Sequence, residues 1–358
     1  MTPDHAICGI LRKHKEFESN VTIINRKTPK KPLTGLHRGV ASDPEDPNPV
    51  MKRAFLVAVG AYVLAAVSQL HAASVFYDSF NYSSGNQVSS GGTPSWSLRN
   101  SPQVDPAITS GSLSYSGLLT ASSDNSVLFN GTNPSGIAIR PLGQVYNIGN
   151  VSTLYYSLTF KVTSIAAADW GGAGNFLTGS FMMGFSQDTS GALVNPSAAA
   201  PLLIRTGDPN NTSGTANDFQ SFQLGTGVTA AAPTGRVFDG TRNYNPGDTL
   251  FLVLSYSFNS GVSNDVARLY VNPVPGSLEG ANTPVVTTSG TVADVSNDQI
   301  QAFFLRNNSV EPAATQIDDL RVGTTWADVT PVPEPSATAL AGCGLLVLLG
   351  CYRLRTRH

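Results

Sequence analysis

The chain has 358 residues, of which 41% are hydrophobic and 13% are charged, and its formal net charge is −2. The charge is unevenly distributed, because residues 74–331 hold 9 Lys+Arg against 17 Asp+Glu, a net charge of −8. This acidic segment contains a single lysine, Lys161, so we expect no nucleic-acid partner, since phosphate contacts need clustered cations.

Residues 1–50 differ from the rest in composition. They hold 8 of the 22 Lys+Arg and three of the 5 histidines, and they end in the Pro/Asp-rich stretch SDPEDPNPV. We expect translation to start at Met51, where a secretory signal begins, with residues 1–50 translated in error. The alternative is a disordered cytoplasmic extension, which their polarity would allow.

Residues 51–73, MKRAFLVAVGAYVLAAVSQLHAA, have the order of a secretory signal peptide. The positive pair Lys52 and Arg53 is followed by an apolar stretch over 54–67 and by small residues that end at Ala73. We predict a signal helix that uses the Sec translocon and is cut by signal peptidase after Ala73 or one residue earlier. A retained transmembrane helix is the alternative.

Residues 74–331 contain short apolar runs separated by Gly, Ser, Asn, Asp and Pro, which is typical of β-strands. The clearest run, 154–163, alternates with period two and places Leu154 and every second residue after it on the core face. The run 248–258 is continuously apolar through Leu254, which predicts burial on both sides at one end. We expect it to pair antiparallel with 266–271 across a loop of about seven residues. Further strands are predicted at 179–186, 201–206, 234–239, 300–306 and 316–322, with an opening edge strand in 76–82.

Many short strands, long polar loops and no repeat predict an all-β, two-sheet antiparallel sandwich over 74–331. The stretches LVLSYSF, ARLYVNP and QIDDLRVGTTWADV, within 248–330, resemble those of laminin-G-like or concanavalin-A-like jelly rolls, which implies that fold. The three cysteines, Cys8, Cys343 and Cys351, lie outside 74–331, so we expect a hydrophobic core without disulfides.

The same segment contains no histidine, which excludes Ser-His-Asp and Cys-His arrangements and His-ligated metal sites there. A glycosidase needs two carboxyl groups across the scissile bond, but no Asp or Glu pair shows a recognisable spacing. Asp318 and Asp319 are adjacent and would face opposite sides of a regular strand, whereas Asp319 and Arg321 would pair on one face. We predict that the protein is not an enzyme, and a carboxylate-based glycan-active enzyme is the less favoured alternative.

The aromatic and loop acidic side chains are the candidate binding residues, because sandwiches of the resembled family hold sugars or calcium. Trp96 and Trp170, and also Trp326, are candidate stacking platforms, although burial is the commoner role of tryptophan. Calcium is the candidate cofactor, and its candidate ligands lie in predicted loops with Asn and Gly neighbours: Asp169, Asp208, Asp218, Asp265 and Asp298. Loop aspartates more often stabilise turns, so the main expectation is that no cofactor is bound.

Residues 332–358 have three parts. An uncharged run of 17 residues, 336–352, is near the lower limit of the roughly 17–25 that cross a bilayer as a helix. Positive charge after such a helix favours a cytoplasmic C-terminus. A buried terminal helix is the alternative. The flanking parts are a proline-bounded tetrapeptide and a basic end, made of Val332, Pro333, Glu334 and Pro335, and of Arg353, Arg355 and Arg357.

This order of Pro-Glu-Pro, short hydrophobic helix and basic end resembles the PEP-CTERM sorting signal of Gram-negative bacteria. The resemblance implies processing by the membrane protease exosortase, transient anchoring in the inner membrane and then release to the cell surface or extracellular matrix. We therefore expect a non-enzymatic structural or adhesive role linked to exopolysaccharide or biofilm. The alternative is a lectin-like module that binds carbohydrate or calcium.

Overall fold

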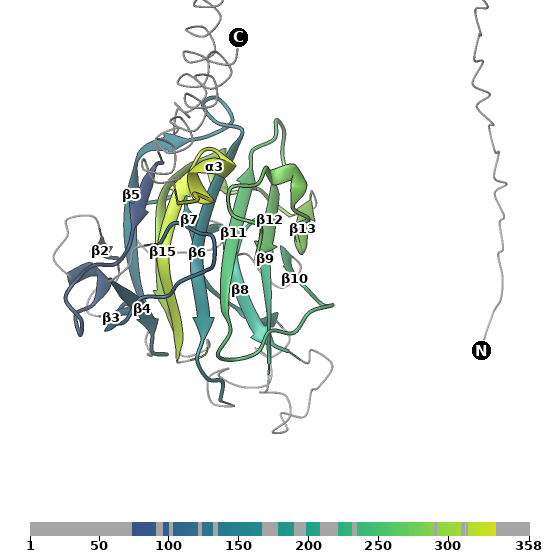
Figure 1. The fold of residues 1–358 in the computed structure, drawn as a ribbon. Helices are drawn as coiled ribbons and strands as arrows, with labels where there is room; N and C mark the ends of the chain where they lie inside the picture. The colour runs from purple at the N-terminus through teal and green to yellow at the C-terminus, as the bar shows by residue number, and fades with distance from the viewer. Residues whose placement is uncertain are drawn as a thin grey trace, which may run out of the picture. The chain divides into compact units, whose positions relative to one another are not determined.

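The structure is a computed structural model, and it describes residues 74–90, 96–99, 103–120, 124–131, 135–166, 178–189, 198–207, 221–230, 235–289, 292–308, 312 and 314–333 (Figure 1). They all belong to the unit Gln69–His358, whereas the other unit, Met1–Ser68, has no described residue. The predicted signal peptide over 51–73 and the hydrophobic tail over 336–352 lie outside the described residues. Among the helices that are described, none is both long and apolar enough to cross a membrane.

The first of two antiparallel sheets has the order β13-β12-β11-β6-β15-β4-β3, and β1 also pairs with β15. β15 is therefore central, with β6 on one side and both β4 and β1 on the other. Its strands are β1 (Phe76–Asp78), β3 (Ala107–Ser110), β4 (Asn125–Phe129), β6 (Thr153–Val162), β11 (Thr249–Ser257), β12 (Val266–Val271), β13 (Val286–Ser289) and β15 (Thr315–Gly323).

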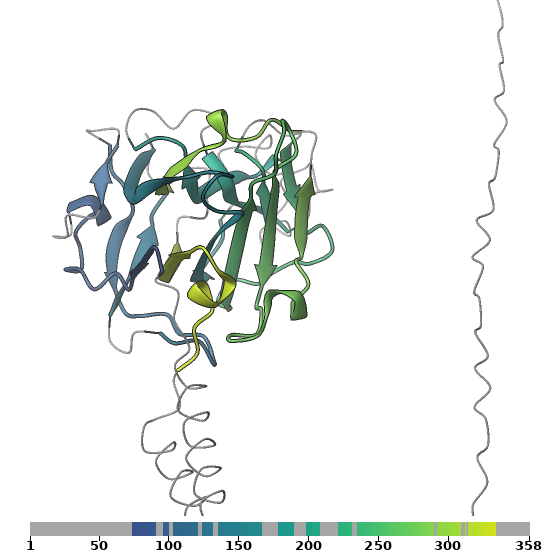
Figure 2. The ribbon, with the colours of Figure 1, turned by 90° about the horizontal axis from the view of Figure 1, so that it is seen from above.

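The second sheet lies behind the first in Figure 1 and has the order β10-β9-β8-β7-β14-β5-β2, so the two form the predicted sandwich (Figures 1 and 2). Its strands are β2 (Ser97–Leu98), β5 (Gly136–Tyr146), β7 (Ser180–Ser186), β8 (Ala198–Thr206), β9 (Phe222–Gly227), β10 (Arg236–Phe238) and β14 (Ile300–Asn307). The described helices are one turn long: η1 (Val88–Ser90), η5 (Glu279–Ala281), η6 (Ser296–Asp298) and α3 (Trp326–Val329).

The main core lies between the two sheets. Every second side chain of β6, from Leu154 to Val162, points into it, because side chains alternate between the two faces of a strand. The ring of Tyr156 packs against two rings of the second sheet, Phe185 at 5.2 Å and Phe303 at 4.9 Å between centroids. The predicted inward set of β6 is thus confirmed. Aromatic contacts of this size and geometry contribute about 0.5–1.5 kcal/mol each beyond the area that they bury.

The outer face of the first sheet is buried too, which the alternation of β6 does not predict. Tyr155 packs there with Phe251, Tyr270 and Trp326 in a second apolar cluster. Phe251 and its neighbours explain the continuously apolar sequence of β11, which is buried on both faces as expected. The cover comes from Trp326 and Val329 of α3 and from Leu118 and Tyr115, which lie between β3 and β4.

We define residues 324–333 as the C-terminal strap. Its helix begins with a capping box in which Thr325 and Asp328 satisfy each other's backbone N–H groups. Beyond the helix, the carbonyl oxygen of Thr330 accepts a hydrogen bond of 2.9 Å from Gly276, and that of Pro331 accepts one of 2.9 Å from Leu119. The strap is therefore bonded to two loops of the sandwich up to the point where the predicted sorting motif begins.

Every predicted strand is present, with bounds that shift by up to three residues except at the opening run. Of the run 76–82, only Phe76–Asp78 forms a strand, and it pairs with β15. The chain turns after Asp78, because its carboxylate accepts a hydrogen bond from the backbone of Phe80, which has a left-handed φ of 52°. The predicted antiparallel pair of 248–258 and 266–271 is confirmed as β11 and β12.

Candidate functional site

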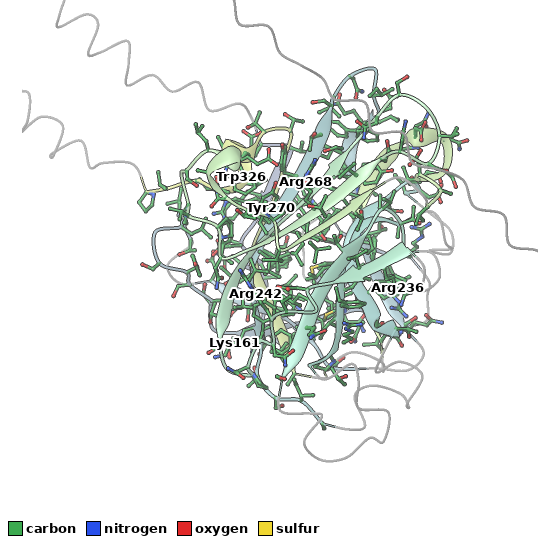
Figure 3. The ribbon with its side chains drawn as sticks, turned by 90° about the vertical axis from the view of Figure 1, so that its right-hand side faces the viewer. Lys161, Arg236, Arg242, Arg268, Tyr270 and Trp326 are labelled. Atoms are coloured by element: carbon green, nitrogen blue, oxygen red, sulfur yellow. The ribbon has the colours of Figure 1, made fainter. Side chains whose placement is uncertain are left out.

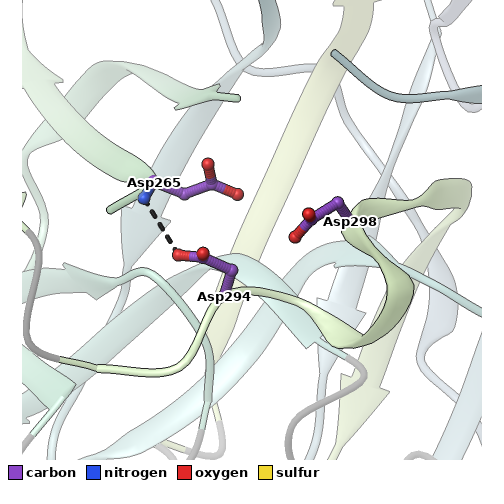
Figure 4. Close-up of side chains that lie close together, drawn as sticks. All are labelled: Asp265, Asp294 and Asp298. Atoms are coloured by element: carbon purple, nitrogen blue, oxygen red, sulfur yellow. Dashed lines mark hydrogen bonds between the residues drawn. The ribbon is translucent and has the colours of Figure 1, made fainter. Parts of the chain in front are cut away.

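Three carboxylates from separate parts of the chain meet beside the β11–β12 turn. One oxygen of each of Asp265, Asp294 and Asp298 lies within 4.8 Å of the others. Asp265 closes the turn after β11, and the other two belong to the connection from β13 to β14. Figure 4 shows the carboxylates of Asp265 and Asp298 turned toward each other, with that of Asp294 below Asp265.

Backbone hydrogen bonds hold the two loops together at this cluster. Oδ1 of Asp294 accepts from the N–H of Asn264 at 3.0 Å and of Asp265 at 2.9 Å. Asp265 in turn accepts from the hydroxyl of Tyr256 at 2.6 Å and from the N–H of Asn259 at 2.7 Å. The positions of Asp265 and Asp294 are thus fixed by the fold of the loops.

Asp298 reaches the cluster from η6 by a different route. Asn297 and Asp298 have left-handed φ angles of 61° and 48°, a conformation that Asn and Asp tolerate better than most residues. No hydrogen bond to the Asp298 carboxylate is present among the described residues. Of the three carboxylates, that of Asp298 therefore accepts the fewest hydrogen bonds from the described residues.

The electrostatic environment of the cluster disfavours three negative charges. Burial raises the pKa of Asp265, the hydrogen bonds from Tyr256 and Asn259 oppose this, and the neighbouring carboxylates raise it further. Burial also raises the pKa of Asp298, and the charge of Asp294 adds to the effect. Within the described part of the chain, none of the three forms an ion pair with Lys or Arg. The cluster can relieve its repulsion by taking up protons or a divalent cation.

The donor set suits calcium, which binds six to eight oxygen ligands. Asn264, whose N–H bonds to Asp294, has a buried side-chain Oδ1 that receives no hydrogen bond from the described part of the chain. Asp294 and Asp298 also line a surface pocket of about 270 Å³ together with Val262 and Ser263. Asp265 and Asp298 were predicted from their loop context, whereas Asp294 was missed because its neighbours Ala293 and Val295 are apolar. Asp169, Asp208 and Asp218 lie outside the described residues.

Trp96, a candidate stacking platform, is a core residue in the structure. The side chain is 3% exposed, because the rings of Phe76 and Phe80 pack against it within the main core. Its Nε1 donates a hydrogen bond of 2.7 Å to Oδ2 of Asp78. Trp170 lies outside the described residues.

Trp326 is likewise a packing residue and not a binding surface. It is 7% exposed, and its ring lies 4.9 Å from that of Tyr270 and 6.2 Å from that of Tyr155. Figure 3 shows Trp326 beside Tyr270, with Lys161 at a distance from both. The commoner role of tryptophan, burial, therefore applies to both tryptophans that the structure describes.

The assumption that Asp318 lies in a regular strand is wrong. The pairing of β15 with β6 shifts register between Asp318 and Arg321, and Asp319 has a left-handed φ of 53°. The predicted pairing of Asp319 with Arg321 is confirmed at 3.6 Å between Oδ1 and the guanidinium. Both aspartates are fully buried.

The Asp318 carboxylate is enclosed by donors of the protein itself. Its Oδ2 accepts from the hydroxyl of Ser112 at 2.7 Å and from the N–H of Leu113 at 2.9 Å. Its Oδ1 accepts from the N–H of Asp319 at 2.7 Å. Such a carboxylate has a structural role, since a catalytic acid or base must reach its substrate.

The predicted sorting residues are described only in part. Val332 and Pro333 belong to the C-terminal strap. The remaining sorting and processing residues lie outside the described residues: Ala73, Glu334, Pro335, Arg353, Arg355 and Arg357.

No protein-family model matches the chain, and no curated protein matches it. Among solved structures, it is similar to the exoplasmic/lumenal domain of VIP36 in a Ca2+/Man-bound form, at 10% identity over 74% of this chain and 98% of that one, with a TM-score of 0.34. It is also similar to the Emp46p carbohydrate recognition domain in its metal-free form, at 12% identity over 64% of this chain and 88% of that one, with a TM-score of 0.31. A third similar structure is domain 4 of AbnA, a GH43 extracellular arabinanase from Geobacillus stearothermophilus, in complex with arabinotriose. The identity is 13% over 72% of this chain and 98% of that one, with a TM-score of 0.35.

The sheet order and register of the chain itself define its class, an all-β protein built as a two-sheet antiparallel sandwich. At these identities and TM-scores, the matches assign it to no particular family.

Proposed function

We propose that this protein is an exported, non-catalytic binding module whose sandwich holds calcium at Asp265, Asp294 and Asp298. The observation that carries the proposal is the approach of three carboxylates within 4.8 Å, without an ion pair to a cationic side chain in the described part of the chain. A bound divalent cation supplies the positive charge that this arrangement lacks.

Calcium at this position joins the β11–β12 turn to the connection before β14. The two loops already share hydrogen bonds between Asp294 and the backbone of Asn264 and Asp265. Neutralising the repulsion between the carboxylates stabilises this loop pair and the pocket beside it. The role proposed for the ion is thus to order a recognition surface.

The proposed ligand of that surface is an extracellular polysaccharide. Support comes from the sequence over 332–358, whose resemblance to exosortase substrates links the protein to exopolysaccharide. A passive structural role in an extracellular matrix is the second candidate. An enzymatic role is not proposed, because residues 74–331 contain no histidine and Asp318 and Asp319 are buried.

Export and processing form the second part of the proposal. Residues 51–73 direct the chain to the Sec translocon, and residues 332–358 anchor it in the inner membrane until exosortase removes everything after about Pro335. Mass spectrometry of protein released by the native host tests this, and an intact His358 would contradict it. Replacing Arg353, Arg355 and Arg357 with serine is expected to leave the tail uncleaved or the protein mislocalised.

Calcium binding and ligand binding are tested separately on the full chain in detergent. The melting temperature is measured over a calcium titration, and a glycan array is probed with calcium and with EDTA. Calcium binding raises the melting temperature, because an ion that binds the folded state stabilises it. A calcium-dependent signal on particular glycans supports the recognition role. A calcium shift without glycan binding favours the matrix role, and no calcium shift contradicts the proposed site.

A further inference from the structure

Four exposed apolar side chains surround the point where the C-terminal strap leaves the sandwich. Leu119, Val274, Leu278 and Val332 are 46%, 64%, 82% and 44% exposed. They come from three segments, GLL over 117–119, VPGSL over 274–278 and PVP over 331–333, that contain no charged residue. We name these four side chains the exit patch.

Several contacts show that the three segments lie side by side. Leu119 donates its N–H to Pro331, and Gly276 donates to Thr330, both at 2.9 Å. A Cβ built on Gly276 would lie 2.6 Å from Cγ1 of Val332, so the valine covers that glycine. The segments that carry the four apolar side chains therefore lie side by side around the exit of the chain.

The loop that carries Leu278 is held in place by the sheet beneath it. The carboxylate of Glu279 accepts from the hydroxyl of Tyr155 at 2.8 Å and of Tyr270 at 2.7 Å. The side-chain amide of Asn282 donates to the carbonyl oxygen of Leu278 at 2.9 Å, and its Oδ1 accepts from the N–H of Val274 at 3.1 Å. With this loop anchored, Leu278 remains exposed. Grouped apolar exposure of this kind marks an interaction surface.

The sequence after the patch indicates its partner. The uncharged run 336–352 begins three residues after Pro333, and three residues span at most about 11 Å. The interfacial layer on each side of the hydrocarbon core is about 5–8 Å thick. When the run 336–352 spans the membrane, Pro333 and the exit patch around it therefore lie close to the headgroup layer.

We propose that the exit patch docks on the lipid bilayer and seats the sandwich on the membrane before processing. The inference rests on the proposed membrane anchor and adds to it a defined contact face and orientation. The end of the first sheet's outer face that carries α3 and the loop of Leu278 faces the membrane (Figure 1). The uncharged segments of the patch suit this contact, because an acidic surface would be repelled by anionic lipid.

The test uses environment-sensitive dyes attached to single cysteines. In the full chain, Cys8, Cys343 and Cys351 are replaced by serine, and Leu278→Cys carries the probe. Val237→Cys is the matched control, because Val237 is 40% exposed but lies in β10 of the second sheet. Figure 3 shows its neighbour Arg236 well away from Trp326 of the strap. Both proteins are reconstituted into vesicles of phosphatidylethanolamine and phosphatidylglycerol.

We expect the dye at 278 to show a blue-shifted emission and several-fold weaker quenching by aqueous iodide than the dye at 237. Val274→Cys provides a second position on the patch if the change at 278 impairs folding. Equal quenching at the patch and at 237, in protein that floats with the vesicles, would overturn docking and leave the anchor intact. Protein that fails to float would overturn both.

Discussion

The indole Nε1 of Trp96 donates a hydrogen bond of 2.7 Å to Oδ2 of Asp78. The same oxygen accepts from the hydroxyl of Tyr82 at 2.6 Å and from the guanidinium of Arg140 at 2.8 Å. Asp78 ends β1 in the first sheet, and Arg140 belongs to β5 in the second sheet. One buried carboxylate therefore connects the two layers of the sandwich.

Replacing Asp78 with alanine is expected to lower the free energy of unfolding by about 3–5 kcal/mol, because it leaves a largely buried arginine without its partner. Urea denaturation measures the change. The control is Asp188→Ala, since Asp188 is 42% exposed and lies 3.7 Å from Arg99, a geometry worth at most about 1 kcal/mol. Equal losses in the two variants would contradict the connecting role of Asp78.

The two described tryptophans are expected to respond differently to phenylalanine. Trp326 has a buried Nε1 without a partner in the described part of the chain, whereas Nε1 of Trp96 is bonded to Asp78. Trp96→Phe leaves a carboxylate oxygen short of one donor, so it should cost about 1–3 kcal/mol more than Trp326→Phe. Chemical denaturation of both variants decides this, and a larger loss in Trp326→Phe would refute it.

Asp318 predicts an unusual dependence of stability on pH. Burial raises its pKa from the ordinary 3.8 to about 7, so between these pH values the folded state holds a proton that the unfolded chain has lost. Its contribution to stability is therefore fully present below about pH 4 and is lost as the pH rises through about 7. Asp318→Asn cannot ionise, and its stability relative to the unmodified protein should increase over this range. Urea unfolding at several pH values measures the difference, and a constant difference would exclude the effect.

The acidic cluster predicts opposite effects of one substitution with and without calcium. Asp298→Asn removes a repelling charge, so in EDTA the variant should be at least as stable as the unmodified protein. In calcium, the unmodified protein should gain about 2.7 kcal/mol at a concentration 100 times the Kd, whereas the variant gains little. Asp248→Asn is the control, because Asp248 is exposed and precedes β11, at the opposite end of that strand from Asp265. Scanning calorimetry follows all three proteins, and an equal gain in Asp298→Asn would show that the ion binds elsewhere.

The strands that could be predicted are those whose apolar residues follow one simple pattern. β6 alternates from Leu154 because every second side chain faces the main core, and β11 is continuously apolar because both of its faces are covered. β5 was missed, since Pro141 and Gly143 interrupt its pattern, and its pairing with β14 shifts register near Ala302. The residue propensities of β5 do not predict a strand, because its irregular backbone is held in the sheet by pairing with neighbouring strands.

The contacts that define the candidate site join residues that lie far apart in the sequence. Asp294 is recruited by the backbone of Asn264 and Asp265, from which it is separated by all of β12 and β13. The sequence around Trp326 does not indicate that Tyr155 and Tyr270 will pack against its ring. Asp265 and Asp298 were recognisable as loop aspartates, but their convergence depends on how the loops fold.

The pairing of β1 with β15 determines when the sandwich can be completed. Phe76, near the start of the described fold, lies opposite Val322 in its last strand, and β15 also separates β6 from β4. A chain synthesised from its N-terminus therefore leaves three strands without their shared neighbour until residue 323 has emerged. Pairings between such distant residues fold slowly. Completion of the first sheet must therefore wait for β15, and until then β1, β4 and β6 lack the strand that joins them.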